Sequence, residues 1–213
     1  MEIKNTKDKK NQFVNCVVVG KPGVGKTSLA KTAKDILVVS VEEGTLSLSG
    51  SDIDYVEAKT FSDVSKVIDF LEKDEKYKWV MIDSITEIGQ NLYFELKGKY
   101  DASKALPMWS EFSLKMGNLI KRIRGLKKHT VVIALPNESQ DDDGRIFIEP
   151  DIYGKSSKKI IAWLDMVFYM FIDKEGNRKL LTEGTDKIVA KDRSGKLAKL
   201  IEPSLDEVIK VVL

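Results

Sequence analysis

The chain has 213 residues, of which 42% are hydrophobic and 32% are charged. This composition excludes a disordered, collagen-like or disulfide-stabilised protein, and the length suits one domain with a sizeable core. The chain contains 35 Lys plus Arg and 33 Asp plus Glu, and the resulting formal charge of +2 does not by itself indicate nucleic-acid or membrane binding.

Cysteine and histidine each occur once, as Cys16 and His129. A single cysteine cannot form a disulfide within the chain, and one cysteine with one histidine is too few for a Cys/His metal site. Both counts favour the reducing environment of the cytoplasm. The longest apolar segment, residues 160–172, is interrupted by Asp165, so we expect neither a signal peptide nor a membrane span.

Short β-branched apolar segments alternate with helical patterns, which is typical of an α/β fold around a mostly parallel sheet. Strands are predicted at residues 13–19, 36–41, 79–82, 130–135 and 166–172, with shorter ones at 179–181 and 187–190. Helices are predicted at residues 61–73 and 85–99, across the apolar positions from 109 to 123, and from 204 to 212. We expect residues 1–12 to be a flexible segment and residues 13–213 to form one domain with a C-terminal β-hairpin extension.

Two long segments, residues 98–107 and 138–159, show neither helical nor strand periodicity. Loops of this length within a compact domain are usually functional or mobile. The two segments are therefore candidates for binding surfaces.

The strongest motif directly follows the first predicted strand. It is a complete GxxxxGK[ST] pattern that opens a helical pattern, which is the context of a P-loop. Backbone N–H groups of such a loop surround phosphate oxygens, Lys26 would reach the β- and γ-phosphates, and the Thr27 hydroxyl would bind Mg²⁺. The motif predicts binding of a nucleoside triphosphate together with Mg²⁺. The residues assigned to this site are Gly20, Lys21, Pro22, Gly23, Val24, Gly25, Lys26, Thr27 and Ser28.

A second motif ends the predicted strand at residues 79–82. Asp83 follows an apolar run, as in a Walker B strand whose carboxylate holds Mg²⁺. Residue 84 is serine, so the Asp-Glu pair with which many ring ATPases activate water is absent. Glu42 and Glu43, at the end of an earlier strand, are the candidates for the general base, and alternation along the strand favours Glu42. A solvated acid at a strand end is the alternative for each of them.

These motifs together resemble the RecA-type ATPase core. Three later segments, residues 135–138, 154–160 and 189–193, extend the likeness over nearly the whole chain from Val14 onward. The chain is similar to the small RecA-like NTPases of phages, some of which act as single-strand annealing or recombination proteins of the Sak group.

The resemblance implies a position for the strand that ends near residue 135. In that family this strand lies between the P-loop strand and the Walker B strand, so a polar residue just after it senses the γ-phosphate. The family often has His-Glu at this place, whereas this chain has Asn137 between Pro136 and Glu138. An amide can still hydrogen-bond a phosphate oxygen. The alternative for Asn137 is an ordinary turn residue.

Lys191 and Arg193 resemble the Lys-x-Arg pair that RecA-like proteins insert into the nucleotide site of a neighbouring subunit. A cation delivered to the γ-phosphate offsets the charge that develops in the transition state. This role would require a homo-oligomer, either a ring or a filament. The alternative is a basic hairpin in solvent.

In RecA-like proteins, two long loops, one after the Walker B helix and one after the sensor strand, hold single-stranded DNA. The resemblance places these loops at the two segments of this chain without an assigned pattern, residues 98–107 and 138–159. Both segments carry aromatic and cationic side chains, which suit sequence-tolerant binding by stacking and phosphate contact. The residues are Lys99, Tyr100 and Lys104 in the first segment and Tyr153, Lys155, Lys158 and Lys159 in the second. A role in closing the sheet is the alternative for each of them.

The leading hypothesis is an ATP-dependent NTPase that acts on single-stranded DNA in phage recombination or replication, in the host cytoplasm. One alternative is a small-molecule P-loop kinase, although we identify no Arg-rich lid. Another is a nucleotide-dependent DNA-binding or assembly module with little hydrolysis. A GTPase is disfavoured because no Asn-Lys-x-Asp motif follows a strand, and no residue specifies which base is bound.

Overall fold

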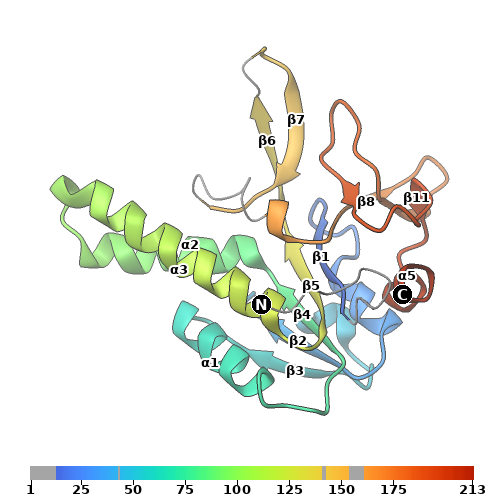
Figure 1. Ribbon diagram of the computed structural model, residues 1–213, viewed down its shortest axis with the longest axis horizontal. Coiled ribbons are helices and arrows are strands. Elements are labelled where there is room, and N and C mark those ends of the chain that lie inside the picture. Colours follow the sequence, from blue (N-terminus) through green and yellow to red (C-terminus); the bar gives the residue numbers. More distant parts are fainter. Residues whose placement is uncertain (1–12, 43, 141–142, 154–160) are drawn as a thin grey trace, which may run out of the picture.

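The computed structural model describes residues 13–42, 44–140, 143–153 and 161–213, and a mixed β-sheet forms their centre (Figure 1). Nine strands of the described residues follow the order β11-β9-β8-β1-β5-β4-β2-β3, with β10 attached to β8. The parallel strands are β1 (Asn15–Val19), β2 (Ile36–Ser40), β3 (Asp54–Glu57), β4 (Trp79–Asp83), β5 (His129–Ala134) and β8 (Met166–Ile172). The antiparallel strands are β9 (Arg178–Leu181), β10 (Lys191–Asp192) and β11 (Leu200–Ile201). The predicted α/β fold is confirmed.

Strand β5 lies between β1 and β4, which is the position that the resemblance implies. Val19 at the end of β1 pairs with Ala134 of β5, and Ser40 at the end of β2 pairs with Asp83 of β4. Because these strands are parallel and in this register, their carboxyl ends meet at one edge of the sheet. The P-loop, Glu42 and Asp83 are thereby brought to the same edge.

Alternate side chains of the central strands enter two separate cores. In β1, Val17 and Val19 pack toward the face covered by α1 (Phe61–Leu71), α2 (Ile85–Lys99) and α3 (Ala105–Gly125). Cys16 and Val18 pack toward the face with η2 (Thr27–Thr32), η3 (Thr45–Leu48) and α5 (Leu205–Val212). Burial on both faces explains why these strands are nearly continuous apolar runs.

The helices begin at side-chain caps that the sequence supplies. Thr60 and Asp63 form a reciprocal capping box at the start of α1, and the Ser84 hydroxyl accepts the Glu87 N–H at the start of α2. The Ser204 hydroxyl accepts the Glu207 N–H at the start of α5. These caps account for the agreement between the predicted and observed starts of the three helices.

Several predicted elements need correction. The helix after the P-loop is a six-residue 3₁₀ helix, η2, and residues 187–190 form only an isolated bridge between Ile148 and Ile188. The segment 98–107 consists of the end of α2, a short turn with a 3₁₀ helix, η4 (Ala102–Lys104), and the beginning of α3. Most of 138–150 belongs to a hairpin of β6 (Pro136–Gln140) and β7 (Ile146–Pro150), which projects from the sheet (Figure 1). The expected flexible segment 1–12 lies outside the described residues.

Across the part of the chain that the structure describes, no helix combines the length and the apolar character that a membrane span requires.

Candidate nucleotide site

The P-loop joins the end of β1 to η2, and its glycines are required by its backbone. Gly23 and Gly25 have φ angles of +78° and +103°, in the region that favours glycine. At Gly20, a Cβ atom would lie 2.7 Å from the Met170 carbonyl oxygen of the adjacent β8. Val24 is buried and packs into the second core, which anchors the loop from inside.

The Lys26 side chain folds back across the P-loop. Its ammonium donates hydrogen bonds to the carbonyl oxygens of Gly20 at 2.7 Å and Lys21 at 3.0 Å. Burial lowers the pKa of Lys26, while the nearby carboxylates of Asp83 and Glu42 oppose that shift. The cation is therefore held, partly desolvated, over the loop whose N–H groups would receive phosphate.

Thr27 and Asp83 meet across the P-loop and Walker B strands. The Thr27 hydroxyl donates to Asp83 Oδ2 at 2.5 Å. Burial is the largest effect on Asp83 and raises its pKa, the Glu42 charge raises it further, and the Thr27 hydrogen bond and Lys26 lower it. A desolvated carboxylate beside a hydroxyl is a hard-oxygen donor pair of the kind that Mg²⁺ binds together with phosphate oxygens. These two residues fit a magnesium ion, which would neutralise phosphate charge when bound.

The Glu42 side chain is hydrogen-bonded to Ser84, the residue that follows Asp83. Its Oε1 accepts a hydrogen bond from the Ser84 hydroxyl at 2.7 Å, and its backbone oxygen accepts one from the Ser40 hydroxyl. The Glu42 side chain is exposed at the sheet edge, where a water molecule can reach it. Glu42 therefore lies with Lys26 and Asp83 in one charged cluster. The second candidate base, Glu43, lies outside the described residues.

Two polar residues of this region escaped the sequence analysis. Glu87, in the first turn of α2, has a pKa raised by burial and by the Glu42 charge, so it borders the same cluster. The pattern Ser84-x-x-Glu87, a capping box, was the available signal. Thr86 donates to the Asp151 carbonyl oxygen at 2.7 Å and accepts the Leu135 N–H at 3.1 Å. No local pattern could have revealed these contacts of Thr86.

Asn137 is the second residue of β6, soon after the end of β5. Its side chain is exposed, and its amide donates to the Ser139 hydroxyl at 3.1 Å. Within the described residues, no hydrogen bond joins Asn137 to the P-loop. Its sensor role stays a prediction.

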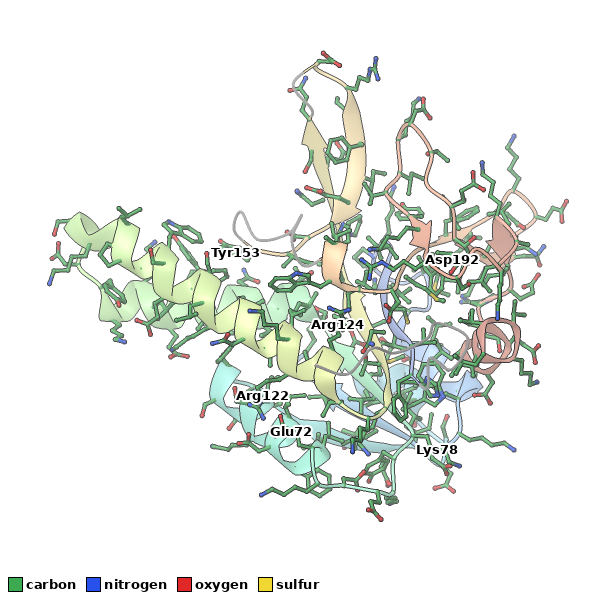
Figure 2. All side chains as sticks on the ribbon, in the orientation of Figure 1. Glu72, Lys78, Arg122, Arg124, Tyr153 and Asp192 are labelled. Carbon is green, nitrogen blue, oxygen red and sulfur yellow. The ribbon has the colours of Figure 1, made fainter. Side chains whose placement is uncertain are left out.

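Lys191 and Arg193 lie away from the P-loop of their own chain. Lys191 in β10 pairs with Val167 near the beginning of β8, whereas the end of β8 adjoins the P-loop. The Lys191 ammonium donates to the Ile161 carbonyl oxygen at 2.6 Å, and the Arg193 guanidinium donates to the Ala162 carbonyl oxygen. Figure 2 labels Asp192, which stands between them on β10. The structure does not bring this pair to the site in cis.

The predicted DNA-contacting residues have diverse surroundings. Lys99 and Tyr100 both donate to Glu111, whose pKa their hydrogen bonds and that of Lys115 lower to about 2. Lys104 is exposed just before α3. Lys155, Lys158 and Lys159 lie outside the described residues.

Tyr153 lies between α3 and the base of the β6–β7 hairpin (Figure 2). Its ring is 5.0 Å from that of Tyr93 and 6.4 Å from that of Trp109, and a Cβ atom at Gly89 would lie 2.9 Å from its own Cβ. One side of the ring is therefore occupied by aromatic packing.

A phosphate-binding loop after β1 and an acidic residue at the end of β4, which is separated from β1 by β5, define a P-loop NTPase. The model of the AAA domain family matches residues 12–194, so the chain belongs to this family. The curated proteins include no match to the chain. Membership agrees with the geometry of Lys26, Thr27 and Asp83 and identifies a nucleotide-binding ATPase domain in general terms.

Proposed function

We propose that this protein hydrolyses ATP at the P-loop and acts on single-stranded DNA, as an annealing or strand-exchange protein in phage recombination or replication. Lys26 and Thr27 hold the triphosphate and its Mg²⁺ with Asp83, and Glu42 accepts the proton of the attacking water. The assignment to phages and to the Sak group is supported by the sequence resemblance alone.

The observation that carries the proposed link to DNA is the position of Thr86. This residue lies three positions after Asp83, and its hydroxyl joins the Leu135 N–H to the Asp151 carbonyl oxygen. Leu135 and Asp151 are the two ends of the segment that contains the β6–β7 hairpin, and Asp151 leads into the proposed DNA loop. A change at Asp83 therefore has a short route to that loop, along the chain to Thr86 and then through the two hydrogen bonds of Thr86.

Oligomer formation is supported by the place of Lys191 and Arg193. Because they lie near the opposite end of β8 from the P-loop, the cations could reach a γ-phosphate only in a neighbouring subunit. A ring or filament would supply that neighbour.

DNA binding can be tested with a fluorescently labelled single strand. We expect ATP to tighten binding about tenfold or more in the wild type, and we expect Lys26→Ala to remove this effect. Binding should weaken steeply across a salt series because phosphate contacts release counterions. Anisotropy titrations with and without ATP measure both effects.

A matched pair of variants locates the DNA surface. Lys155→Gln/Lys158→Gln should lose affinity, whereas Lys66→Gln/Lys73→Gln on the α1 side should not. Binding that is indifferent to ATP and salt would contradict the proposal. ATP binding without measurable turnover would favour the alternative of a nucleotide-dependent assembly module.

A further inference from the structure

A cationic side chain from the far end of the sequence lies against the P-loop. Arg178 is the first residue of β9 and pairs with Ile172, the last residue of β8. Since β8 runs parallel to β1 and adjoins it, the β8–β9 hairpin emerges at the sheet edge that carries the P-loop. Arg178 is thereby placed beside a loop that lies 154 residues earlier in the chain.

The turn that presents Arg178 is held by its own hydrogen bonds. Asp173 accepts the N–H groups of Glu175 at 2.9 Å and Asn177 at 2.8 Å, and Gly176 takes the positive φ of +86° that the turn requires. These bonds lower the pKa of Asp173, so the carboxylate stays charged at neutral pH. The hairpin is therefore a defined support for the arginine.

Arg178 contacts the P-loop at its second half. Its Nε donates to the Val24 carbonyl oxygen at 2.9 Å. A Cβ atom on Gly25 would lie 2.7 Å from that Nε and 3.1 Å from Arg178 Cδ. The guanidinium thus occupies the space that a side chain at Gly25 would fill, directly beside the N–H groups that receive phosphate.

The charge of Arg178 has no counter-ion in the described part of the chain. No ion pair within 4.0 Å joins it to a carboxylate of the described residues, although the neighbouring Lys179 pairs with Glu202. A guanidinium has five N–H donors, of which the bond to Val24 uses one. An exposed arginine with spare donors beside a phosphate-binding loop suits a charge-assisted contact to phosphate oxygens.

We propose that Arg178 is a phosphate-binding residue of the nucleotide site, contributed by the same subunit through the β8–β9 hairpin. It holds Val24 through Nε and binds the polyphosphate through its terminal nitrogens. The proposal rests on nucleotide binding at the P-loop but is independent of DNA. Arg178 acts in cis, in contrast to the trans role proposed for Lys191 and Arg193.

Binding measurements separate this role from that of a structural support. Arg178→Gln keeps an N–H donor for Val24 but removes the charge, Arg178→Lys keeps the charge, and Lys174→Gln removes a cation from the same turn as a control. We expect Arg178→Gln to bind ATP and inorganic pyrophosphate about tenfold more weakly at low salt, with Arg178→Lys intermediate and Lys174→Gln unchanged. The deficit of Arg178→Gln should shrink as salt rises, because ions screen the lost interaction.

Three results would overturn the proposal. The first is an Arg178→Gln affinity for pyrophosphate equal to that of Lys174→Gln. The second is a loss for ATP without a loss for pyrophosphate, which would place the contact at the base or ribose. The third is a salt-independent loss that Arg178→Lys does not recover, which would indicate a purely structural role. Failure of nucleotide binding itself is recognised separately, because Lys26→Ala would then match the wild type.

Subunit mixing checks the cis assignment. Because Arg178 serves its own P-loop, mixing Arg178→Gln with Lys26→Ala should recover no ATPase activity beyond the sum of the two variants. Recovery would place Arg178 in a neighbour's site and overturn the assignment.

Discussion

At the scale of single residues, the nucleotide site contains two acidic side chains, Glu42 and Glu87, in addition to the proposed magnesium ligand Asp83. After burial, the Glu42 charge contributes to the raised pKa of both Asp83 and Glu87. Of these three side chains, the Ser84 hydroxyl contacts only that of Glu42. A fixed orientation is what a general base needs, because the carboxylate must face the water whose proton it removes. Glu42 is thus better placed for this role than Glu87.

Replacement of the base should separate binding from chemistry. We expect Glu42→Gln to bind ATP like the wild type and to hydrolyse it about 10²–10⁴-fold more slowly, which is the usual contribution of a general base. Glu87→Gln is the matched control and should retain most of the activity. Phosphate release and binding of a fluorescent ATP analogue measure the two properties, and an unchanged rate in Glu42→Gln would transfer the role to Glu43.

Asp83 should limit the stability of the nucleotide-free protein. Burial raises its pKa, so the folded state binds the proton more tightly than the unfolded state does. The stabilisation from the protonated form is complete below the ordinary carboxyl pKa and is lost as pH rises through the raised pKa. Above the raised pKa, the charged Asp83 therefore destabilises the fold.

We expect Asp83→Asn to have a higher Tm than the wild type at pH 7.5 without nucleotide. The increase should be about 2–4 °C for each kcal/mol that the substitution adds to the free energy of unfolding. The difference should vanish as the pH is lowered below the ordinary carboxyl pKa of 3.8, because both the folded and the unfolded states are then protonated. Mg-ATP should raise the Tm of the wild type more than that of the variant. Thermal unfolding at the two pH values tests this, and a lower Tm for Asp83→Asn at pH 7.5 would contradict it.

At the scale of elements, the basic end of α3 is partly neutralised by α1. Arg122 donates to Glu72 at 2.9 Å and to Asp69 at 2.5 Å, so it bridges the two helices (Figure 2). Residues 115–128 contain six basic and no acidic residues, a composition that favours a solvated helix face. This local sequence does not reveal the two acidic partners of Arg122. The net positive charge of the surface around this end of α3 is therefore smaller than the local sequence indicates.

Removal of this bridge should cost little stability and no activity. The pairs are exposed, so we expect Arg122→Ala to lower the free energy of unfolding by about 0.5–1 kcal/mol. The corresponding fall in Tm should disappear in high salt because the pairs are then screened. Arg124→Ala, two residues beyond on the same helix, controls for general charge loss; an equal effect in both variants would count against the bridge.

Local pattern predicted the elements that are buried or capped and missed those that are exposed. Helix α2 matches its predicted bounds because its cap and apolar face are encoded within the segment. Strand β3 is mostly exposed and β6 is polar, so neither has the apolar signature of a strand. The helix after the P-loop is shortened to η2, in which the Thr32 hydroxyl donates to the Leu29 carbonyl oxygen and competes with helical hydrogen bonding.

At the scale of the whole molecule, the two ends of the central strands carry different charged groups. The P-loop, Glu42 and Arg178 lie at the carboxyl ends of β1, β2 and β8, whereas Lys191 lies beside the beginning of β8. If both sets serve one reaction, each complete site needs two subunits. A single chain would then be a weak ATPase, and activity would rise with protein concentration.

Subunit mixing tests this arrangement. Lys191→Ala/Arg193→Ala lacks the trans cations and Lys26→Ala lacks the phosphate-binding lysine, so each alone should be inactive. Their mixture should recover part of the ATPase rate, since some interfaces combine an intact P-loop with an intact Lys-x-Arg pair. Lys199→Ala, which removes an exposed cation from the same region, should stay active. A mixture without recovery would exclude a trans role.

The sequence by itself determined the P-loop, the acidic end of β4 and the α/β class, because each depends on residues that are neighbours in the chain. It also contained Glu42, but it did not show that Ser84 would contact it. Only the tertiary structure decided that Thr27 meets Asp83, that Thr86 joins both ends of the hairpin segment, and that Arg178 lies on Val24. These contacts depend on strand order and register, which are set by packing across the sheet and leave no trace in local periodicity.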